Sequence, residues 1–460
     1  MSESTHPTIS PSDTARPEPA TAGHQGSETQ VGSVFVSNYP PFSAWSKEQL
    51  AAAEEALTAP PENADEPFGL YLHLPFCRKR CKFCYFRVYT DKNSGEIGRY
   101  TDALAKEVEI YAGKPALAGR PLRFVYFGGG TPSYISVRHL TALVERLRQA
   151  FSWDAVEEVT FECEPGTLTR SKLAAIRELG ITRLSLGIEN FNDAILRENG
   201  RAHLTKEIDR VLPWIEELDF DQLNVDLIAG MVGETWDTWR ETVARTVDLA
   251  PDSVTVYQME LPFNARFSQK LLDGEGLEQP LADWETKRAW NDFAIEQLAA
   301  AGYEVSSAYT MIRPGKKASR FLYRDALWHG SDLIGTGIAS FSHFQGVHFQ
   351  NTASWADYLA GIEAGELPWF RAFETAAEDR LTRELILQLK LGEISPESFE
   401  QKFGVDVLRR YEPAWKDLEE RGMLSVEPSG AVELTRAGLL QVDSLLPNFY
   451  AETYRGARYT

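Results

Sequence analysis

The sequence predicts an α/β fold: a partial (β/α)6 barrel followed by a mainly helical, winged-helix-like C-terminal domain. From residue 68 onward, six apolar runs typical of strands buried on both faces alternate with amphipathic stretches, and several runs end in Gly or Pro. After about residue 372 this alternation stops. Six βα units in series imply a parallel sheet with right-handed crossovers, curved like a partly closed relative of the eight-stranded barrel. Reactive groups are then expected on loops at the C-terminal ends of the strands.

The N-terminal region divides into two parts. Residues 1–32 are rich in Ser, Thr, Pro and Gly and poor in large apolar residues, so we expect a disordered tail. Residues 33–67 are predicted to form an anchor segment in which SNYPPFSAW supplies aromatic side chains. Ser46 and Gln49 fit a capping box before KEQLAAAEEAL, which predicts a short helix.

The barrel is predicted over residues 68–305. Between two of its strands, Ile97, Tyr100, Leu104, Val108 and Tyr111 recur at helical spacing. The predicted strands are 68–76, 122–130, 158–165, 181–189, 220–230 and 252–261.

Two regions follow the barrel. Residues 306–371 are interpreted as a connecting and substrate-covering region, and residues 372–460 as the C-terminal domain. In that domain RLTRELILQLKL and LRRYEPAWKDLEERGML read as helices, and SVEPSGAVELT as a hairpin around Ser429 and Gly430. This pattern resembles a winged-helix module. The acidic context favours a packing or lid role over DNA binding.

The composition argues against some classes of binding partner and indicates a cellular compartment. A formal net charge of −20 argues against nucleic acid or an anionic membrane as the main partner. The N-terminus lacks the order of a signal peptide, and no apolar run approaches the ~20 residues of a membrane span. Four clustered cysteines favour metal binding in a reducing compartment over a disulfide framework. We therefore expect a cytoplasmic protein.

Three of the four cysteines, Cys77, Cys81 and Cys84, follow the first predicted strand with the spacing C-x3-C-x2-C. Zinc motifs usually bring a second pair of ligands, and the remaining Cys163 lies on a predicted buried strand, where a small core residue is expected. In an iron–sulfur site, three thiolates hold three irons of a [4Fe–4S] cube and leave the fourth iron open to a chelating molecule. A zinc-stabilised scaffold is the alternative. The basic residues around the cysteines form either a solvated loop or a surface that favours thiolates or docks an electron donor: Arg78, Lys79, Arg80, Lys82 and Arg87.

From this motif onward the chain resembles a family. YLHLPFCRKRCKFCYF, YFGGGTPS, FECEPGTL, RLSLGIENFND, GRAH, LNVDLIAGM and VTVYQMELP resemble radical S-adenosylmethionine (SAM) proteins of the oxygen-independent coproporphyrinogen III oxidase group. That group includes the oxidase, haem chaperones, and class C methyltransferases and cyclopropane-forming enzymes. The resemblance continues through DLIGTGIASFS and LTRAGLLQVDSLLPNFY, and so covers residues 68 to 450.

The resemblance implies a site. Cys77, Cys81 and Cys84 would bind a [4Fe–4S] cluster whose open iron takes the methionine moiety of SAM. A one-electron donor such as flavodoxin or ferredoxin would reduce the cluster, SAM would be cleaved, and the resulting radical would take a hydrogen atom from a small-molecule substrate, a tetrapyrrole being one candidate. The implied SAM contacts are Tyr71, Phe83, Gly129, Gly130, Thr131, Glu162, Glu189, Arg201 and Asp226.

The chain departs from the family's pattern at two positions, the first of which concerns a SAM contact and the second the substrate. Glu189 stands where the family commonly has Gln, and Phe86 stands where the true oxidase carries a further cysteine. Besides the oxidase, we therefore keep a methyltransferase or cyclopropane-forming enzyme, in which Met259 and Glu260 lie in the second-SAM region. We also keep a non-catalytic haem chaperone. For the chaperone the candidate axial ligands are His329, His343 and His348.

Overall fold

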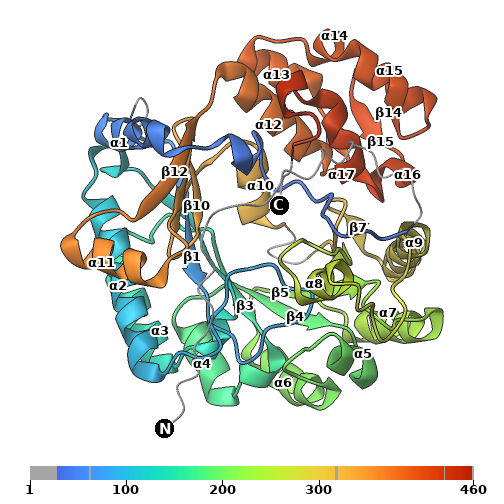
Figure 1. Ribbon diagram of the computed structural model, residues 1–460, viewed down its shortest axis with the longest axis horizontal. Helices are drawn as coiled ribbons and strands as arrows, with labels where there is room; N and C mark the ends of the chain where they lie inside the picture. The colour runs from blue at the N-terminus through green and yellow to red at the C-terminus, as the bar shows by residue number, and fades with distance from the viewer. Residues whose placement is uncertain (1–27, 62–63, 316–319, 429, 458–460) are drawn as a thin grey trace.

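The computed structural model describes residues 28–61, 64–315, 320–428 and 430–457. Its centre is a 12-stranded sheet with the strand order β12-β11-β10-β9-β1-β2-β3-β4-β5-β6-β8-β7 (Figure 1). Strands β1 to β6 lie side by side in chain order and all pair in parallel, which confirms the predicted series of βα units. These six strands are β1 (Phe68–Leu74), β2 (Leu122–Gly129), β3 (Glu158–Cys163), β4 (Arg183–Glu189), β5 (Gln222–Ala229) and β6 (Ser253–Gln258).

Helices cover the outer face of the parallel strands (Figure 1). The five residues with helical spacing in the first crossover are all buried, on the inner side of α2. Asn93 caps this helix by accepting from the backbone N–H groups of Gly95 and Glu96. The helices of this region are α1 (Leu50–Thr58), α2 (Ser94–Ala112), α3 (Val137–Ala150), α4 (Arg170–Glu178), α5 (Asp193–Glu198), α6 (Thr205–Leu218), α7 (Trp236–Leu249), α8 (Arg266–Leu272) and α9 (Trp284–Ala300).

Short strands extend the sheet beyond the six that were predicted. β9 pairs in parallel with β1, and β10, β11 and β12 continue from it in antiparallel order. On the other edge β8 pairs with β6 and β7 with β8, both antiparallel. Most of residues 306–371 therefore add to the sheet. The elements are β7 (Glu304–Val305), β8 (Thr310–Ile312), α10 (Leu322–Trp328), β9 (Asp332–Thr336), β10 (Phe341–Phe344), β11 (Val347–Asn351), α11 (Trp355–Ala364) and β12 (Trp369–Glu374).

The predicted N-terminal helix is present, but its predicted capping box is wrong. α1 is preceded by a 3₁₀ turn over Lys47–Gln49, and the Ser46 side chain caps neither. Ser46 instead pairs through its backbone with Ala372 of β12, and Gln49 accepts a hydrogen bond from the backbone N–H of Glu374. Both groups that a capping box would use, the Ser46 N–H and the Gln49 side chain, are therefore hydrogen-bonded to the edge strand β12.

The aromatic anchors are confirmed. Trp45 stacks on His348 with ring centroids 5.2 Å apart, and Phe42 lies 4.4 Å from Phe341. Most of the predicted disordered tail, residues 1–27, lies outside the described residues. Of the remaining tail residues, Gly32 donates a hydrogen bond to the carbonyl oxygen of Leu261.

The C-terminal domain contains helices and a small antiparallel sheet of order β13-β15-β14. The predicted hairpin is formed by β14 and β15, although Ser429 in its turn lies outside the described residues. The second predicted helix is two helices, because Pro413 has no N–H to donate to the carbonyl oxygen of Arg409 and its ring would clash with that carbonyl in a continuous helix. The elements are α12 (Ala377–Leu389), β13 (Glu393–Ile394), α13 (Pro396–Phe403), α14 (Val407–Arg410), α15 (Glu412–Glu420), β14 (Leu424–Val426), β15 (Val432–Leu434), α16 (Arg436–Leu439) and α17 (Val442–Leu445).

Within the described parts of the chain, no helix has the length and apolar character needed to span a bilayer.

Candidate active site

The three clustered cysteines lie on the loop that joins β1 to α2. The base of the loop is closed by backbone hydrogen bonds: Tyr89 N–H to Pro75 at 2.7 Å and Cys77 N–H to Tyr89 at 3.0 Å. All three thiols line one cavity of about 2610 Å³, which extends from the C-terminal ends of the barrel strands to the C-terminal domain. The loop is thus a defined structure that presents its thiols to a shared space.

The surroundings of the thiols favour a metal over free thiolates. Thr131 donates to Cys77 Sγ at 3.3 Å, and Arg201 donates to Cys81 Sγ at 3.5 Å. Burial raises the pKa of Cys77 to about 12 and that of Cys84 to about 11, with the neighbouring thiols adding to both shifts. A coordinating thiol is deprotonated by the metal itself, so this environment suits ligands and not nucleophiles.

The donor set fits a [4Fe–4S] cluster better than zinc. Among the described residues, no group of three or more His, Cys, Asp or Glu side chains is arranged to hold one metal ion. A structural zinc needs four ligands that converge on it, whereas the thiols of a cube bind different irons and need not converge. Cys163 belongs to the hydrophobic core, as predicted, and is not part of this set.

The glycine run after β2 brings backbone against the cysteine loop. Gly130 N–H donates to Leu74 and Thr131 N–H donates to Phe76, at 3.0 and 2.8 Å. A Cβ on Gly130 would lie 2.9 Å from the Phe76 backbone, and one on Gly129, whose φ is +113°, would lie 2.6 Å from the His73 ring. Only glycine permits this approach, which leaves a side-chain-free cradle beside the cysteines.

Two carboxyl groups point inward from β3 and β5. Glu162 accepts hydrogen bonds from Tyr126 Oη at 2.7 Å and from Gly129 N–H at 3.2 Å. Asp226 accepts from Ser185 Oγ and Asn224 Nδ2, both at 2.9 Å. Burial raises the pKa of both groups, that of Glu162 to about 7. They are acceptors for the hydroxyl or ammonium groups of a ligand in the barrel interior.

Glu189 and Arg201 form an ion pair between the carboxyl end of β4 and the cysteine loop. Glu189 Oε1 lies 3.4 Å from Arg201 Nη1, and Arg201 also donates to the carbonyl oxygen of Gly187 at 2.7 Å. Glu189 has a φ of +66°, strained for a residue with a Cβ. Burial raises its pKa to about 7, with Asp226 adding to the shift and Arg201 opposing it. Arg201 thus connects Cys81 to the carboxylate at the predicted SAM position.

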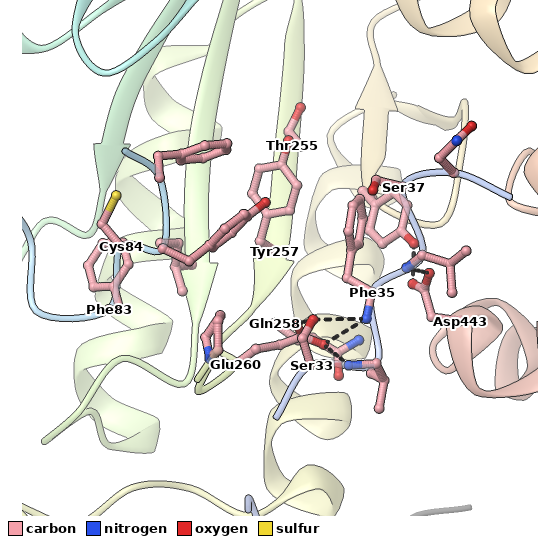
Figure 2. Close-up of a pocket in the computed structure, with 18 of the residues that line it drawn as sticks. Ser33, Phe35, Ser37, Phe83, Cys84, Thr255, Tyr257, Gln258, Glu260 and Asp443 are labelled. Carbon is pink, nitrogen blue, oxygen red and sulfur yellow. Dashed lines mark hydrogen bonds between the residues drawn. The ribbon is translucent and has the colours of Figure 1, made fainter. Parts of the chain in front are cut away.

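The remaining predicted contacts also line this cavity. Tyr71 bonds to His73 Nδ1 at 3.1 Å and stacks on Tyr126 with ring centroids 5.8 Å apart. Phe83 packs against an apolar cluster that includes Met259. Figure 2 shows Phe83 and Cys84 on one side of the pocket, facing Tyr257 and Glu260. The structure therefore brings all the predicted cysteine and SAM positions together.

Residues named for the alternative functions are distributed differently. Glu260 lines the cavity and accepts hydrogen bonds from the backbone N–H groups of Val34 and Phe35, and so holds the N-terminal segment (Figure 2). His343 and His348 line the cavity, with their Nδ1 atoms 3.2 Å apart, and burial lowers the pKa of both well below the ordinary value. His329 is exposed and donates from Nδ1 to the backbone carbonyl oxygen of Asp325 at 2.7 Å.

The basic residues around the cysteines separate into two groups. Arg80 donates to the carbonyl oxygens of Cys84 and Asn264, and Lys82 forms an ion pair with Glu198 at 3.2 Å. These two hold the loop in place. Arg78, Lys79 and Arg87 are exposed, although Arg78 also donates to the carbonyl oxygen of Ala202 and lies 3.5 Å from Glu164 in an ion pair.

Sequence reasoning missed several cavity residues. Tyr126 lies two positions before Gly128 on β2, and the period of two could have placed it on the inward face with Glu162. Phe35 and Asp443 reach the cavity from the two ends of the chain, and no local pattern predicts that (Figure 2).

Comparison with known proteins agrees with this geometry. Residues 71–246 match the radical SAM superfamily, and residues 376–441 match the HemN C-terminal domain. The chain is 27% identical over 397 residues to an oxygen-independent coproporphyrinogen III oxidase of Pseudomonas aeruginosa, covering 83% of this chain and 85% of that protein. It is 26% identical over 388 residues to the haem chaperone HemW of Bacillus subtilis, covering 83% of this chain and 99% of that protein.

The fold agrees as well. The structure of coproporphyrinogen III oxidase HemN from Escherichia coli superposes with a TM-score of 0.78 at 24% identity, covering 90% of this chain and 96% of that one. The chain therefore contains a radical SAM domain followed by a HemN C-terminal domain, and its homologues are oxygen-independent coproporphyrinogen III oxidases and haem chaperones.

Proposed function

We propose that this protein is a radical SAM oxidoreductase that acts on a tetrapyrrole with carboxylate side chains, such as coproporphyrinogen III. The observation that carries the proposal is the aromatic wall of the cavity beside the cysteines. Tyr85, Phe86 and Tyr257 are 37%, 42% and 42% exposed, and all three line this cavity. Large aromatic faces left open inside a pocket favour a flat, largely apolar ligand.

The pairing of these rings supports the same ligand. Tyr85 and Phe86 stack with centroids 4.4 Å apart, and Tyr257 stacks on Tyr309 at 6.2 Å. The cavity of about 2610 Å³ exceeds the 300–1,000 Å³ of an ordinary small-molecule site. It therefore has room for a macrocycle in addition to SAM.

The cofactors of this chain are a [4Fe–4S] cluster and SAM, which together supply hydrogen-atom abstraction by a carbon radical when bound. Within that chemistry we assign the iron ligands to Cys77, Cys81 and Cys84. The glycine cradle and Thr131 supply close backbone contacts to SAM, while Arg201 adds positive charge beside Cys81. Glu162, Glu189 and Asp226 supply acceptors for its polar groups. The remaining assigned contacts, Tyr71 and Phe83, close the pocket against water.

Two further roles complete the proposal. Residues 306–371 cover the substrate, which is supported by the cavity positions of Phe321, Tyr323 and His343. A one-electron donor such as flavodoxin or ferredoxin docks near the cysteine loop, which the exposed Arg78, Lys79 and Arg87 support. A cytoplasmic location, where thiols stay reduced, fits the four free cysteines.

The test is anaerobic turnover. The reconstituted protein is reduced and incubated with SAM, with or without coproporphyrinogen III, and 5′-deoxyadenosine and CO₂ are measured. We expect 5′-deoxyadenosine to rise with substrate concentration and CO₂ to be released. Cleavage of SAM at one rate with and without coproporphyrinogen III would refute the oxidase. A methyl or methylene mass gain on another substrate would identify the methyltransferase-like branch instead.

A haem chaperone is the second candidate, because Phe86 replaces the additional cysteine of the true oxidase and because the HemW relative is covered over 99% of its length. Haem titration distinguishes the two functions. A chaperone binds haem with a shift of the Soret band and shows no substrate-linked SAM cleavage. The side chains to replace in that case are His343 and His348.

A further inference from the structure

A buried arginine lies at the amino-terminal end of the barrel strands, away from the cysteines. Arg183 is the first residue of β4, and its side chain is only 1% exposed to solvent. It lines the same cavity as the three thiols. Its guanidinium lies over the ring of Phe321, 3.9 Å from the ring centroid. An always-charged group is thus enclosed in the floor of the pocket.

Two nitrogens of the guanidinium have no hydrogen-bond partner in the described protein around them. Among the described residues, neither Nε nor Nη1 of Arg183 has a hydrogen-bond acceptor, although both atoms are buried. The nearby carboxyl groups of Glu162 and Asp226 are engaged by other donors. Glu158 accepts from the backbone N–H groups of Leu322 and Tyr323. The charge of Arg183 acts on Glu162 and Asp226 and opposes the rise in pKa of both. Its buried N–H groups nevertheless lack acceptors, and buried donors left unused are costly, so an acceptor group of a ligand is favoured there.

A second arginine adds positive charge to the same end. Arg324 is 6% exposed and bonds to Asp325 and Ser306, but its Nη1 has no partner among the described side chains and backbone. Burial lowers the pKa of Arg324, and the positive charge of Arg183 contributes to that shift. Arg324 does not line the cavity, so Arg183 supplies the unused N–H donors at the floor and Arg324 adds charge behind it.

The pocket above the floor is shaped for one carboxylate on an organic molecule. A guanidinium offers parallel N–H donors that match the two oxygens of a carboxylate. Tyr126, Phe321 and Tyr323 form an aromatic wall beside it, with centroids of Tyr126 and Tyr323 4.3 Å apart. This combination suits a ligand that carries a carboxylate on a short side chain of a largely apolar framework.

Position separates this anchor from the cysteine end of the SAM site. β4 runs from Arg183 to Glu189, which at 3.3 Å per residue places their Cα atoms about 20 Å apart. Glu189, Arg201 and the cysteines lie at the carboxyl end, so the carboxylate of a SAM bound there is far from Arg183. We propose that Arg183 binds a carboxylate of the substrate and so fixes the depth at which the substrate enters the barrel; this rests on the proposed function for the identity of that substrate.

The first experiment tests the anchor alone. The cluster-loaded, full-length protein is heated in increasing sodium propionate against sodium chloride at equal ionic strength. We expect propionate to raise the melting temperature of the wild type and not that of Arg183→Met. Arg183→Lys, which keeps the charge without the fork, should respond partially. An equal response of wild type and Arg183→Met would overturn the proposal. Arg123→Met, on β2 of the same sheet and paired with Glu157 in a partly exposed ion pair, is the matched control and should behave as the wild type.

The second experiment uses coproporphyrin III, the fluorescent oxidised form of the proposed substrate, and its tetramethyl ester. Arg183→Met should weaken binding of the acid at least about 30-fold, as expected when a buried charge loses its partner, and leave the ester nearly unchanged. Equal losses for acid and ester would mean a structural role and contradict the proposal. Loss of SAM affinity in equilibrium dialysis would assign the carboxylate to SAM and likewise contradict it.

The two experiments separate the anchor from the proposed function. A wild type that does not bind coproporphyrin III, but is stabilised by propionate only when Arg183 is present, would refute the tetrapyrrole and retain the carboxylate anchor.

Discussion

Cys77 and Cys84 are thiols whose surroundings oppose ionisation until a metal arrives. Because burial raises their pKa values to about 12 and about 11, each ligand must release a proton when it binds iron at neutral pH. Binding of the cluster is therefore linked to pH. The affinity of the thiols for iron rises with pH, because the free thiols hold protons that the iron-bound thiolates do not. Arg201 beside Cys81 helps to hold the resulting negative charge.

Replacing one ligand should remove the cluster. In Cys81→Ser the loop keeps its backbone hydrogen bonds but loses one soft ligand, so we expect iron and sulfide content after anaerobic reconstitution to fall by most of the wild-type value, together with the visible absorbance. Cys163→Ser is the matched control, since that residue is packed in the core of β3. Retention of full iron by Cys81→Ser, or its loss in a folded Cys163→Ser, would contradict the ligand assignment.

Glu189 is predicted to make the apoprotein less stable as pH rises. Burial raises its pKa to about 7, above the ~4.3 of an unfolded glutamate, so the folded state holds the proton more tightly between these values. Its contribution to stability is full below about pH 4 and is lost as pH rises through 7. Glu189→Gln does not titrate, and we expect it to be on the order of 1–3 kcal/mol more stable than the wild type at pH 8 and nearly equal at pH 5.

Urea unfolding of the apoprotein at these two pH values measures the difference. Glu178→Gln, on the exposed side of α4, is the control and should follow the wild type. A Glu189→Gln variant that is less stable than wild type at pH 8 would mean that the ion pair with Arg201 outweighs the cost of burying the carboxylate.

At the scale of elements, Glu107 connects α2 to the strands that extend the sheet. Its Oε2 accepts from Gly337 N–H at 2.8 Å and Tyr358 Oη at 2.7 Å, and its Oε1 accepts from Asn351 Nδ2 at 2.6 Å. The residue is fully buried. One side chain thus positions the turn after β9, the end of β11 and helix α11.

Glu107→Gln should loosen that junction. An amide offers one acceptor oxygen and places N–H groups against a donor, so we expect a loss of about 1–3 kcal/mol in the free energy of unfolding. The control is Glu109→Gln on the same helix, whose pair with Arg146 is partly exposed and worth about 0–1 kcal/mol. Chemical denaturation at fixed pH measures the free energy of unfolding of both variants. Equal losses in the two variants would show that the junction does not depend on Glu107.

The elements that were predicted from sequence differ physically from those that were missed. β1 to β6 are long apolar runs that end in recognisable glycine and carboxylate motifs, so their existence and order could be read directly. β8 to β12 are short and carry polar residues such as Ser342, His343 and Gln350. They are strands because the open edges of the barrel offer backbone partners, and that information is not local.

The same limit applies to the site. The cysteines, the glycine cradle and the inward carboxyl groups belong to local motifs and could be predicted. Arg183 could not, because its importance depends on which groups fail to reach it in the folded chain.

Over the whole molecule, residues 32–39 form an N-terminal strap between barrel and C-terminal domain. Gly32 pairs with Leu261, Glu260 holds Val34 and Phe35, and Val36 donates to Asp443 at 2.9 Å (Figure 2). The segments that meet here are separated by up to 407 positions, so only the fold brings them together. The strap closes one side of the cavity and makes the two ends of the chain part of the site.

The ion pair between Lys390 and Asp443, next to this strap, should contribute strongly to the stability of the contact between the barrel and the C-terminal domain. Asp443 lies 2.7 Å from Lys390 Nζ, whose residue is fully buried, and also accepts from Tyr309 Oη. Asp443→Asn leaves the lysine without a counter-charge in a low-dielectric site, so we expect a loss of about 3–5 kcal/mol in urea unfolding.

Two further variants show whether that loss comes from the buried charge. The double variant Lys390→Met/Asp443→Leu removes both charges and should lose less than the two single changes together, because neither partner is then left buried alone. Asp417→Asn breaks a pair with Arg421 that is about half exposed, and should cost about 0–1 kcal/mol. If Asp443→Asn costs no more than Asp417→Asn, the strap and the C-terminal domain are held by their apolar contacts, chiefly Tyr39 against Tyr450 and Tyr454, and not by the buried pair.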